Sequence, residues 1–250
     1  MASVSQQGQF WDRVTEQAQP LDEALRLIES LIPTEAIRDR DVLDAGCGAG
    51  DYSAAFGQVG ARSVTAFDVS TGSLRLAVGK TPAGRFARAS LSELPYRSAS
   101  FDVIWSWGVL HYVPNAQAAM REIVRVLRPG GVAVVHTLRT GFWSSFEAAG
   151  AKLFSAAPSW VEPLVLSGGE RIVPLVTRLL TGRRPEEQTS KTVRQKIHER
   201  LFVPGEQRTF TLEQLVKGFG PSVETSQAHP PVADLLNRNM SITVVVRKPR

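Results

Sequence analysis

The stretch DVLDAGCGAG, at residues 41–50, is an apolar run that leads into three glycines at alternate positions. The apolar part is typical of a buried strand, and the glycines let the backbone turn sharply and bring its N–H groups close to a ligand. A dinucleotide-binding loop needs G-x-G-x-x-G, but here the third glycine position falls on Asp51, where a pyrophosphate would meet a carboxylate. The observed spacing, with Asp44 before it, indicates a strand-to-helix turn that suits a cationic ligand.

Short apolar runs alternate with helical patterns from residue 41 to residue 138, which is typical of a parallel sheet with helices on both faces. We expect strands at 41–45, 63–67, 85–89, 101–106 and 131–138, and helices at 50–59, 70–78 and 115–127. The last helix is expected to end at RPGG, residues 128–131, because proline and two glycines do not continue a helix.

The remaining segments complete the predicted domain. Residues 139–209 lack strand alternation and are rich in Phe, Trp, Leu, Pro and Gly, so we interpret them as a helical cap insertion. Further elements are expected as one or two helices in 10–31, a helix at 210–220, and strands at 223–227 and 241–248. The prediction is a single α/β domain with a Rossmann-like, seven-stranded, mostly parallel sheet. Its parts are N-terminal lid helices (1–40), a cofactor-binding core (41–138), the cap insertion (139–209), and a C-terminal helix and strands (210–250).

The composition excludes several classes of protein. The 250 residues are 43% hydrophobic and 21% charged, which is typical of one large globular domain and argues against disorder. No apolar run reaches about 18 residues, and the N-terminus lacks the pattern of a secretory signal. Cys47 is the only cysteine, which excludes an intramolecular disulfide and a cysteine-cluster metal site. We therefore expect a cytoplasmic protein with no membrane segment.

The net charge of +5 is small and spread along the chain. Its densest basic region, residues 171–208, is interspersed with glutamates, so a solvated surface is favoured over a nucleic-acid partner. The four histidines and the carboxylates show no ligand spacing, and we expect no metal.

Asp68 ends the second predicted strand, 18 residues after Gly50. A carboxylate at this place can accept hydrogen bonds from both ribose hydroxyls of an adenosine ligand. The alternative is that Asp68 only caps the helix that follows.

Four segments of the chain resemble the class I S-adenosylmethionine-dependent methyltransferases, in their small-molecule, type 11-like branch. The segments are VLDAGCGAG (42–50), FDV (67–69), LPYRSASFDVIWSWGVLHYVPN (94–115) and EIVRVLRPGGVAVV (122–135). The resemblance covers about 10–138 and resumes at the C-terminal helix and strands, whereas the insertion carries no family motif.

The resemblance implies that the cofactor is S-adenosyl-L-methionine and assigns its contacts. The methionine part would be held by Asp44 and the glycine turn, the ribose by Asp68, the adenine by residues after the second and third strands, and the reactive methyl group would lie at the end of the fourth strand. The implied cofactor contacts are Asp44, Gly46, Cys47, Gly48, Gly50, Asp68, Val69, Ser90, Leu91, Ser106 and Trp107. Ser90 stands where many relatives have an aspartate that contacts the adenine amino group, so the adenine contact uses either this serine or Glu93.

The segment after the fourth strand contains two candidate bases, His111 and Tyr112. An imidazole titrates near neutrality, so His111 is the first candidate, with a structural histidine in this loop as the alternative. The family resemblance implies that Trp11, His111 and Trp143 border the acceptor pocket, where indole rings would shield a sulfonium. The alternative is that these tryptophans only pack the insertion onto the core.

The sequence thus predicts methyl transfer from S-adenosylmethionine to an O, N or C atom of a small, fairly apolar metabolite. Two alternatives stay open: a tRNA or rRNA methyltransferase, and a non-catalytic S-adenosylmethionine-binding protein. The expected partner is the small-molecule acceptor, and the protein is expected to be a monomer or a homodimer. The insertion is either a cap over the pocket or a dimer surface.

Overall fold

The computed structural model describes residues 8–9, 11–12, 20–141, 161, 164–165, 167–168, 208–229 and 241–250. The chain divides into two compact units, Met1–Gly141 with Glu206–Arg250, and Phe142–Gly205. Trp143 and most of the predicted cap insertion lie outside the described residues. The fold and the candidate site below belong to the first unit.

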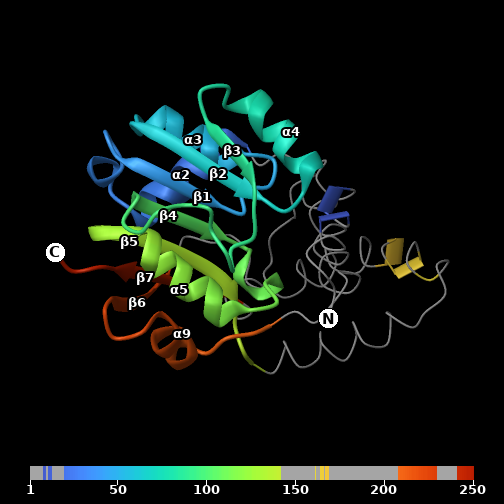
Figure 1. The fold of residues 1–250 in the computed structure, drawn as a ribbon. Helices are drawn as coiled ribbons and strands as arrows, with labels where there is room; N and C mark the ends of the chain where they lie inside the picture. The colour runs from blue at the N-terminus through green and yellow to red at the C-terminus, as the bar shows by residue number, and fades with distance from the viewer. Residues whose placement is uncertain are drawn as a thin grey trace, which may run out of the picture. The chain divides into compact units, whose positions relative to one another are not determined.

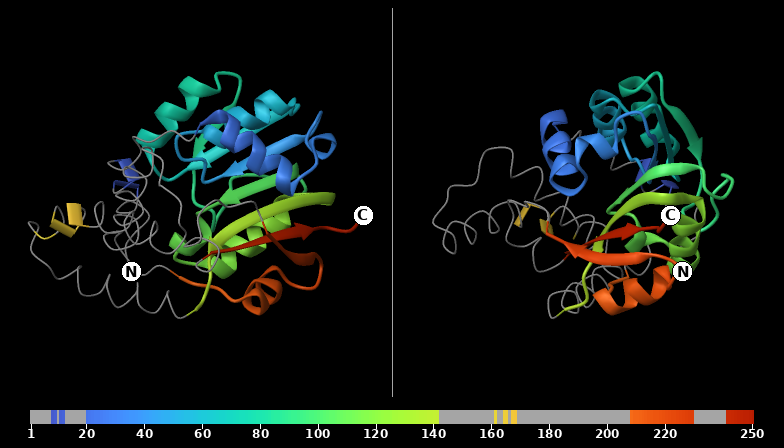
Figure 2. Two further views of the ribbon diagram at one scale, coloured as in Figure 1. Left: turned by 180° about the vertical axis from the view of Figure 1, so that it is seen from behind. Right: turned by 90° about the vertical axis from the view of Figure 1, so that its left-hand side faces the viewer.

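A seven-stranded sheet forms the centre of the first unit (Figure 1). Its strands are β1 (Asp41–Ala45), β2 (Ser63–Asp68), β3 (Arg85–Arg88), β4 (Phe101–Trp107), β5 (Leu127–Leu138), β6 (Glu224–Ala228) and β7 (Ser241–Arg247). The order is β3-β2-β1-β4-β5-β7-β6, in which the first five strands are parallel and β7 is antiparallel to both β5 and β6. Figure 2 shows β7, in red, beside β5, with β6 in orange at the outer edge. The predicted seven-stranded, mostly parallel sheet is confirmed.

Helices cover both faces of this sheet, as predicted. They are α2 (Leu21–Leu31), α3 (Asp51–Val59), α4 (Thr71–Lys80), α5 (Ala116–Val126) and α9 (Leu212–Phe219), with short 3-10 helices η1 (Thr34–Ala36) and η2 (Leu110–Tyr112). α2, α3 and α4 pack on one face, and α5 and α9 pack on the other. The chain crosses from one side of β1 to the other between β3 and β4. Ligands of open α/β sheets bind at such a switch point, at the carboxyl ends of the strands.

Polar side chains cap the first turns of three helices. The Ser70 hydroxyl and the Asn115 amide oxygen each accept a backbone N–H in the first turn of α4 and α5. Thr211 forms a capping box with Gln214 at the start of α9. Each cap satisfies backbone N–H groups that have no partner within the helix.

The segment RPGG differs from the prediction. α5 ends at Val126, and residues 128–131 belong to β5, which begins at Leu127. These residues form an irregularity in the β4–β5 ladder, and Gly130 has a φ of 78° while its N–H donates to the carbonyl of Lys248 at 2.8 Å. The predicted end of the helix is confirmed, but the strand begins at Leu127 and not at residue 131 as expected, because backbone hydrogen bonds to Lys248, just after the antiparallel neighbour β7, keep Gly130 in the sheet.

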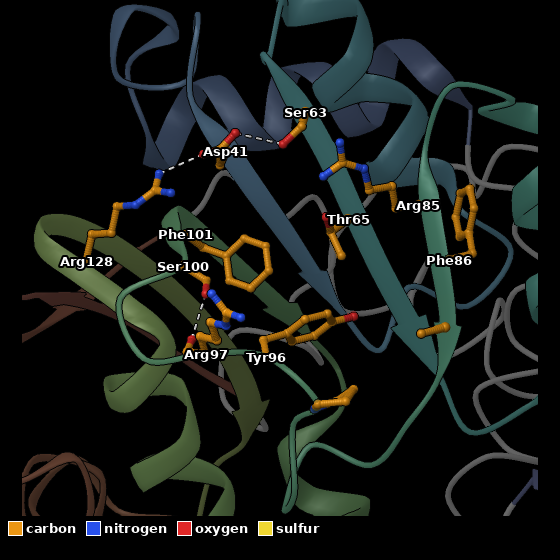
Figure 3. A pocket seen from close by; sticks show the side chains of 12 residues that line it. Asp41, Ser63, Thr65, Arg85, Phe86, Tyr96, Arg97, Ser100, Phe101 and Arg128 are labelled. Atoms are coloured by element: carbon orange, nitrogen blue, oxygen red, sulfur yellow. Dashed lines mark hydrogen bonds and ion pairs between the residues drawn. The ribbon is translucent and has the colours of Figure 1, made fainter.

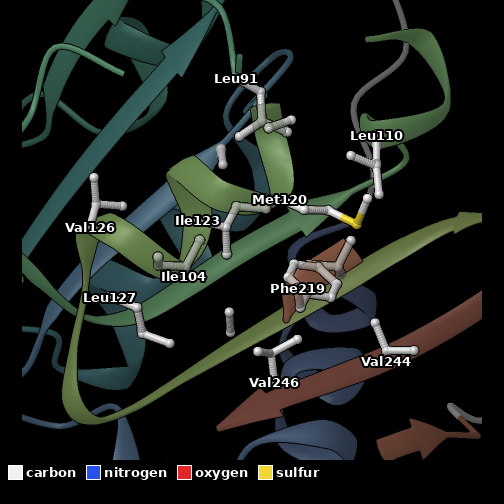
Figure 4. Packing of buried hydrophobic residues seen from close by; sticks show 14 of the residues in the cluster. Leu91, Ile104, Leu110, Met120, Ile123, Val126, Leu127, Phe219, Val244 and Val246 are labelled. Atoms are coloured by element: carbon white, nitrogen blue, oxygen red, sulfur yellow. The ribbon is translucent and has the colours of Figure 1, made fainter. Parts of the chain in front are cut away.

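The core on the α5 face joins helices and strands that are distant in sequence (Figure 4). Ile123 and Met120 of α5 pack with Phe219 of α9 and Val246 of β7, and all four are at most 3% exposed. This packing ties the C-terminal elements to the parallel sheet and fixes the position of β5 next to β4.

The segments that flank residues 142–205 pair with each other. Phe210 donates its N–H to the carbonyl of Leu138 and accepts a hydrogen bond from Thr140, each at 3.0 Å. The hydroxyl of Thr140 also donates to that of Thr209 at 3.0 Å. The chain therefore leaves and re-enters the first unit at one place, beside the end of β5.

Candidate functional site

The glycine turn after β1 has two packed positions and one open position. Gly46, Gly48 and Gly50 all have positive φ, at 82°, 52° and 82°. A Cβ atom on Gly46 would lie 2.3 Å from Val109, and one on Gly50 would lie 2.7 Å from Ala77. A Cβ on Gly48 would meet nothing within 4 Å. Gly48 is therefore the part of the turn that leaves room for a ligand beside the backbone.

Asp44, at the end of β1, is a buried carboxyl group that binds the helix after the turn. It is 1% exposed, and the Ser53 hydroxyl in the first turn of α3 donates to its Oδ2 at 2.6 Å. Burial raises the pKa of Asp44 to about 7. Sequence analysis predicted the aspartate but missed Ser53, whose position nine residues later on the facing side of the first helical turn is the only signal for it.

Asp68, at the end of β2, binds the glycine turn. Its Oδ2 accepts the N–H of Gly48 and its Oδ1 accepts the N–H of Ser70, both at 2.9 Å. The side chain is half-buried, and burial raises its pKa while these two hydrogen bonds offset part of the effect. The carboxylate thus holds Ser70, the residue that caps α4, so the alternative interpretation is met only indirectly. Each oxygen still has a second lone pair, so the cap does not exclude a ribose contact.

A segment before α2 contacts the start of α4, next to Asp68. Oδ1 of Asp12 accepts hydrogen bonds from the Ser70 hydroxyl at 2.6 Å and from the Gly72 N–H at 2.8 Å. These bonds hold the pKa of Asp12 below its usual value. A Cβ atom on Gly8 would lie 2.8 Å from the Val69 carbonyl oxygen, so this segment lies close against the residue after Asp68. Sequence analysis missed Asp12, because nothing local marks a contact across 58 residues.

The residues predicted to contact adenine follow β2 and β3. Val69 is half-buried, and its carbonyl accepts from Arg88 Nε at 3.0 Å. Ser90 is half-buried and forms a turn in which its carbonyl accepts the N–H of exposed Glu93 at 3.1 Å. The Leu91 side chain is 2% exposed and packs in the core on the α5 face, so its backbone N–H is the group left for a ligand.

Two buried polar atoms at the end of β4 have no hydrogen-bond partner among the described residues. They are the hydroxyl oxygen of Ser106 and the indole nitrogen of Trp105, and both residues are 0% exposed. An unsatisfied buried hydroxyl costs about 1–3 kcal/mol, and Ser106 is the residue predicted to lie beside the reactive group. A ligand at this edge would offer it a partner.

Aromatic rings stack across β4 and β5 on the α3 side. Trp107 lies parallel to Trp105 at 5.1 Å and to His136 at 4.0 Å between ring centroids. Nδ1 of His136 lies 2.8 Å from the Thr243 hydroxyl, and burial lowers the pKa of His136 to about 4. Sequence analysis missed His136 in this role, because its place beside Trp107 depends on the register between the two strands.

The two candidate bases lie in η2. His111 is 5% exposed, with Nδ1 3.3 Å from the Thr137 hydroxyl and its carbonyl accepting from Arg208 at 2.9 Å. The Tyr112 ring lies 4.0 Å from that of His111 and makes an edge contact at 5.0 Å with half-buried Trp11. The structure therefore brings together Trp11, His111 and Tyr112, three of the residues predicted for substrate binding and catalysis.

Cys47 has a buried thiol whose pKa is raised by burial, and its Sγ contacts the Gly48 carbonyl at 3.6 Å. Within the ranges that the structure describes, His, Cys, Asp and Glu form no group of three or more that could hold a metal ion. Among the described helices, none combines the length and the apolar character that crossing a bilayer requires.

Curated relatives match the part of the chain that holds this site. A malonyl-[acyl-carrier protein] O-methyltransferase of Erwinia pyrifoliae is 35% identical over 133 residues, which are 53% of this chain and 49% of the relative. The 27-O-demethylrifamycin SV methyltransferase of Amycolatopsis mediterranei is 33% identical over 130 residues, 49% of this chain and 47% of the relative. The matches span about half the length of each relative.

The fold has solved counterparts. An S-adenosylmethionine-dependent methyltransferase from Mesorhizobium loti superposes with a TM-score of 0.59 at 22% identity, covering 92% of this chain and all of the other. Residues 43–135, which run from β1 into β5 and include the glycine turn, Asp68 and the end of β4, match the family described as methyltransferase domain. The chain therefore contains a class I S-adenosylmethionine-dependent methyltransferase domain.

Proposed function

We propose that the protein transfers a methyl group from S-adenosyl-L-methionine to an O, N or C atom of a small, fairly apolar metabolite. The observation that carries this proposal is the hydrogen bond from the Gly48 N–H to Asp68, which joins the open position of the glycine turn to a carboxylate at the end of the next strand. This pairing supports binding of an adenosine ligand whose cationic end lies toward Asp44.

The residues present fit this cofactor. The ribose hydroxyls would donate to the free lone pairs of Asp68, while Val69, Ser90 and the backbone of Leu91 would contact the adenine. The methionine part would lie along the turn at Gly48, where space is open, with its ammonium group near Asp44. A cation there favours the ionised form of Asp44 and lowers its pKa from about 7. When bound, the cofactor supplies a methyl group on a positively charged sulfur.

The side chains at the ends of β4 and β5 support the proposal that the methyl acceptor is apolar. Trp107 and His136 form a stacked pair, and His136, with its pKa of about 4, is uncharged at neutral pH. Trp11 reaches the same carboxyl-end side of the sheet through its contact with Tyr112. In-line displacement needs the acceptor held against the methyl group, and flat uncharged rings provide such a surface without competing hydrogen bonds. Trp143 is proposed as a further contact of the acceptor on the sequence alone.

An oxygen acceptor is the first to test. One relative is named for O-methylation and the other for a 27-O-demethyl substrate. A hydroxyl acceptor must lose a proton, and we assign its removal to His111, which Thr137 holds by its Nδ1, with Tyr112 against its ring. On this proposal, His111→Asn lowers kcat and leaves the Kd of S-adenosylhomocysteine unchanged. Loss of cofactor binding in this variant would instead indicate a structural histidine.

The direct test is release of S-adenosylhomocysteine with a set of acceptors. Purified protein is incubated with methyl-labelled S-adenosylmethionine and phenols, hydroxylated macrocycles, carboxylic acids, amines or bulk tRNA. Label in a small molecule supports the proposal. Label in RNA, with binding that falls steeply as salt rises, would replace it by the nucleic-acid alternative. Tight cofactor binding without turnover on any acceptor would indicate the non-catalytic alternative.

A further inference from the structure

The connection between β3 and β4, residues 89–100, contains no helix. α5 packs against β5 and η2, and α9 packs against β6 and β7. Among the described helices, none therefore packs mainly on β2 and β3 on this face, where the connection itself lies. A cavity of about 440 Å³ lies beneath it (Figure 3). This volume is within the range of small-ligand sites, which is about 300–1,000 Å³.

The cavity lies at the opposite end of the strands from the glycine turn. Asp41, Ser63, Arg85 and Phe101, which line it, are the first residues of β1, β2, β3 and β4. Asp68 is the last residue of β2, and the glycine turn follows the last residue of β1. The cavity is therefore separate from the proposed cofactor site.

Two arginines at the cavity carry positive charge that no described residue balances. Arg128 binds both Asp41 and Asp102 at 2.8 Å, and Arg62 also pairs with Asp41, so these two aspartates are balanced by two arginines. The other lining arginines, Arg85 and Arg97, are exposed. Neither guanidinium group makes an ion pair or a hydrogen bond within the part of the chain that the structure describes. The bond drawn at Arg97 in Figure 3 is from the Ser100 hydroxyl to the Arg97 backbone carbonyl.

Aromatic rings and hydroxyl groups form the rest of the lining. The rings of Tyr96 and Phe101 meet edge to face at 5.1 Å, and Figure 3 shows Arg97 beside them. The Arg85 side chain reaches from β3 across β2 toward Thr65, which is 8% exposed and forms part of the floor. The lining thus combines two unpaired guanidinium groups with flat apolar walls.

We propose that this cavity binds a small aromatic anion, with Arg85 and Arg97 on its charged group and its ring against Tyr96 and Phe101. Guanidinium groups bind phosphate or carboxylate through two parallel hydrogen bonds, and a ring that contributes to binding must be covered by apolar atoms. The proposal does not depend on methyl transfer, since none of the lining residues belongs to the proposed cofactor site.

The test is calorimetric titration of the full chain with phenyl phosphate, inorganic phosphate and phenol. We expect saturable binding of phenyl phosphate with a Kd on the order of 1 mM or below. Inorganic phosphate and phenol should each bind at least about tenfold more weakly, because each lacks one half of the recognised group. Saturating S-adenosylhomocysteine should leave the Kd for phenyl phosphate unchanged.

A double variant of the two exposed arginines tests whether phenyl phosphate binds in this cavity. Arg85→Gln with Arg97→Gln should weaken phenyl phosphate binding by about tenfold or more without altering the unfolding midpoint, because neither side chain holds the fold together. The matched control, Arg38→Gln with Arg121→Gln, removes the same charge from exposed positions outside the cavity and should leave the Kd unchanged. The proposal is overturned by absent binding, by equal binding of inorganic phosphate, by displacement with S-adenosylhomocysteine, or by equal Kd values for the two double variants.

Discussion

Oδ2 of Asp68, at the end of β2, lies 2.9 Å from the backbone nitrogen of Gly48 in the turn after β1. One hydrogen bond thus joins the ends of two neighbouring parallel strands. The same carboxylate also accepts the backbone N–H of Ser70, the residue that caps α4. Fold and proposed function share this contact, because the group that would receive the ribose also fixes the turn beside which the rest of the cofactor would lie.

Gly48 and Gly50 of the turn should differ in how much stability the protein loses when each is replaced by alanine. Gly50→Ala places a Cβ 2.7 Å from the backbone of Ala77 at a φ of 82°, and should lower the free energy of unfolding by about 2–5 kcal/mol. Gly48→Ala meets open space and should cost only the left-handed conformation, about 1–2 kcal/mol, while it obstructs the ligand. Urea unfolding measures both changes.

Gly57→Ala is the control for these substitutions. Gly57 lies within α3, has no neighbour within 4 Å of a built Cβ, and should gain about 0.5–1 kcal/mol from the better helix former. Equal destabilisation by Gly48→Ala and Gly50→Ala would contradict the distinction between an open and a packed glycine.

Asp44 should make the protein less stable as the pH rises. Its folded-state pKa is raised from 3.8 to about 7, so the folded protein holds this proton more tightly than the unfolded chain does. The contribution of this proton to the free energy of unfolding is complete below about pH 4 and is lost by about pH 7. Between these values the free energy of unfolding falls by up to about 1.4 kcal/mol per pH unit. Asp44→Asn should abolish this contribution in unfolding measurements from pH 4 to 8. An identical pH profile in this variant would show that Asp44 does not titrate there.

The titration of His136 should make the protein more stable as the pH rises, opposite to the effect of Asp44 in the same pH range. Burial lowers its pKa from 6.5 to about 4, so the unfolded chain takes up the proton more readily. Its contribution to stability is present above about pH 6.5 and is lost as the pH falls toward 4. His136→Phe should remove this acid sensitivity and keep the stacking on Trp107. Because the Asp44 and His136 effects oppose each other, the wild-type profile should be flatter than that of either variant.

Asp12 and Ser70 should be energetically coupled. Their 2.6 Å hydrogen bond joins the segment before α2 to the first turn of α4. A double-mutant cycle with Asp12→Ala and Ser70→Ala should give a coupling energy of about 1 kcal/mol in urea unfolding. Asp12→Ala combined with Ser30→Ala should be additive, because the Ser30 hydroxyl donates to the Leu27 carbonyl within α2. Additivity in the Asp12–Ser70 cycle would mean that the contact does not form in solution.

The features that could be predicted from the sequence are those that local pattern and strand topology determine. Apolar runs predicted the seven strands, and helical patterns predicted α2, α3, α4, α5 and α9. The placement of Asp68 beside the glycine turn follows from strands whose carboxyl ends meet at one edge. The Asp12–Ser70 contact and the stacking of His136 on Trp107 were not predictable, because each depends on tertiary contacts or register. The strand character of Gly130 likewise depends on its distant partner, Lys248.

Asp68 and the glycine turn are proposed to bind S-adenosylmethionine. Calorimetric titration with S-adenosylmethionine and S-adenosylhomocysteine compares the wild-type protein with Asp68→Asn and with the control Asp39→Asn, an exposed residue before β1 whose φ of 58° asparagine also adopts. We expect wild-type protein and the control to bind both ligands with micromolar Kd values. Asp68→Asn should bind on the order of 10- to 100-fold more weakly, because it loses charge-assisted bonds to the ribose. Folded wild-type protein that binds neither ligand, or an Asp68→Asn variant with an unchanged Kd, would rule out cofactor binding by Asp68.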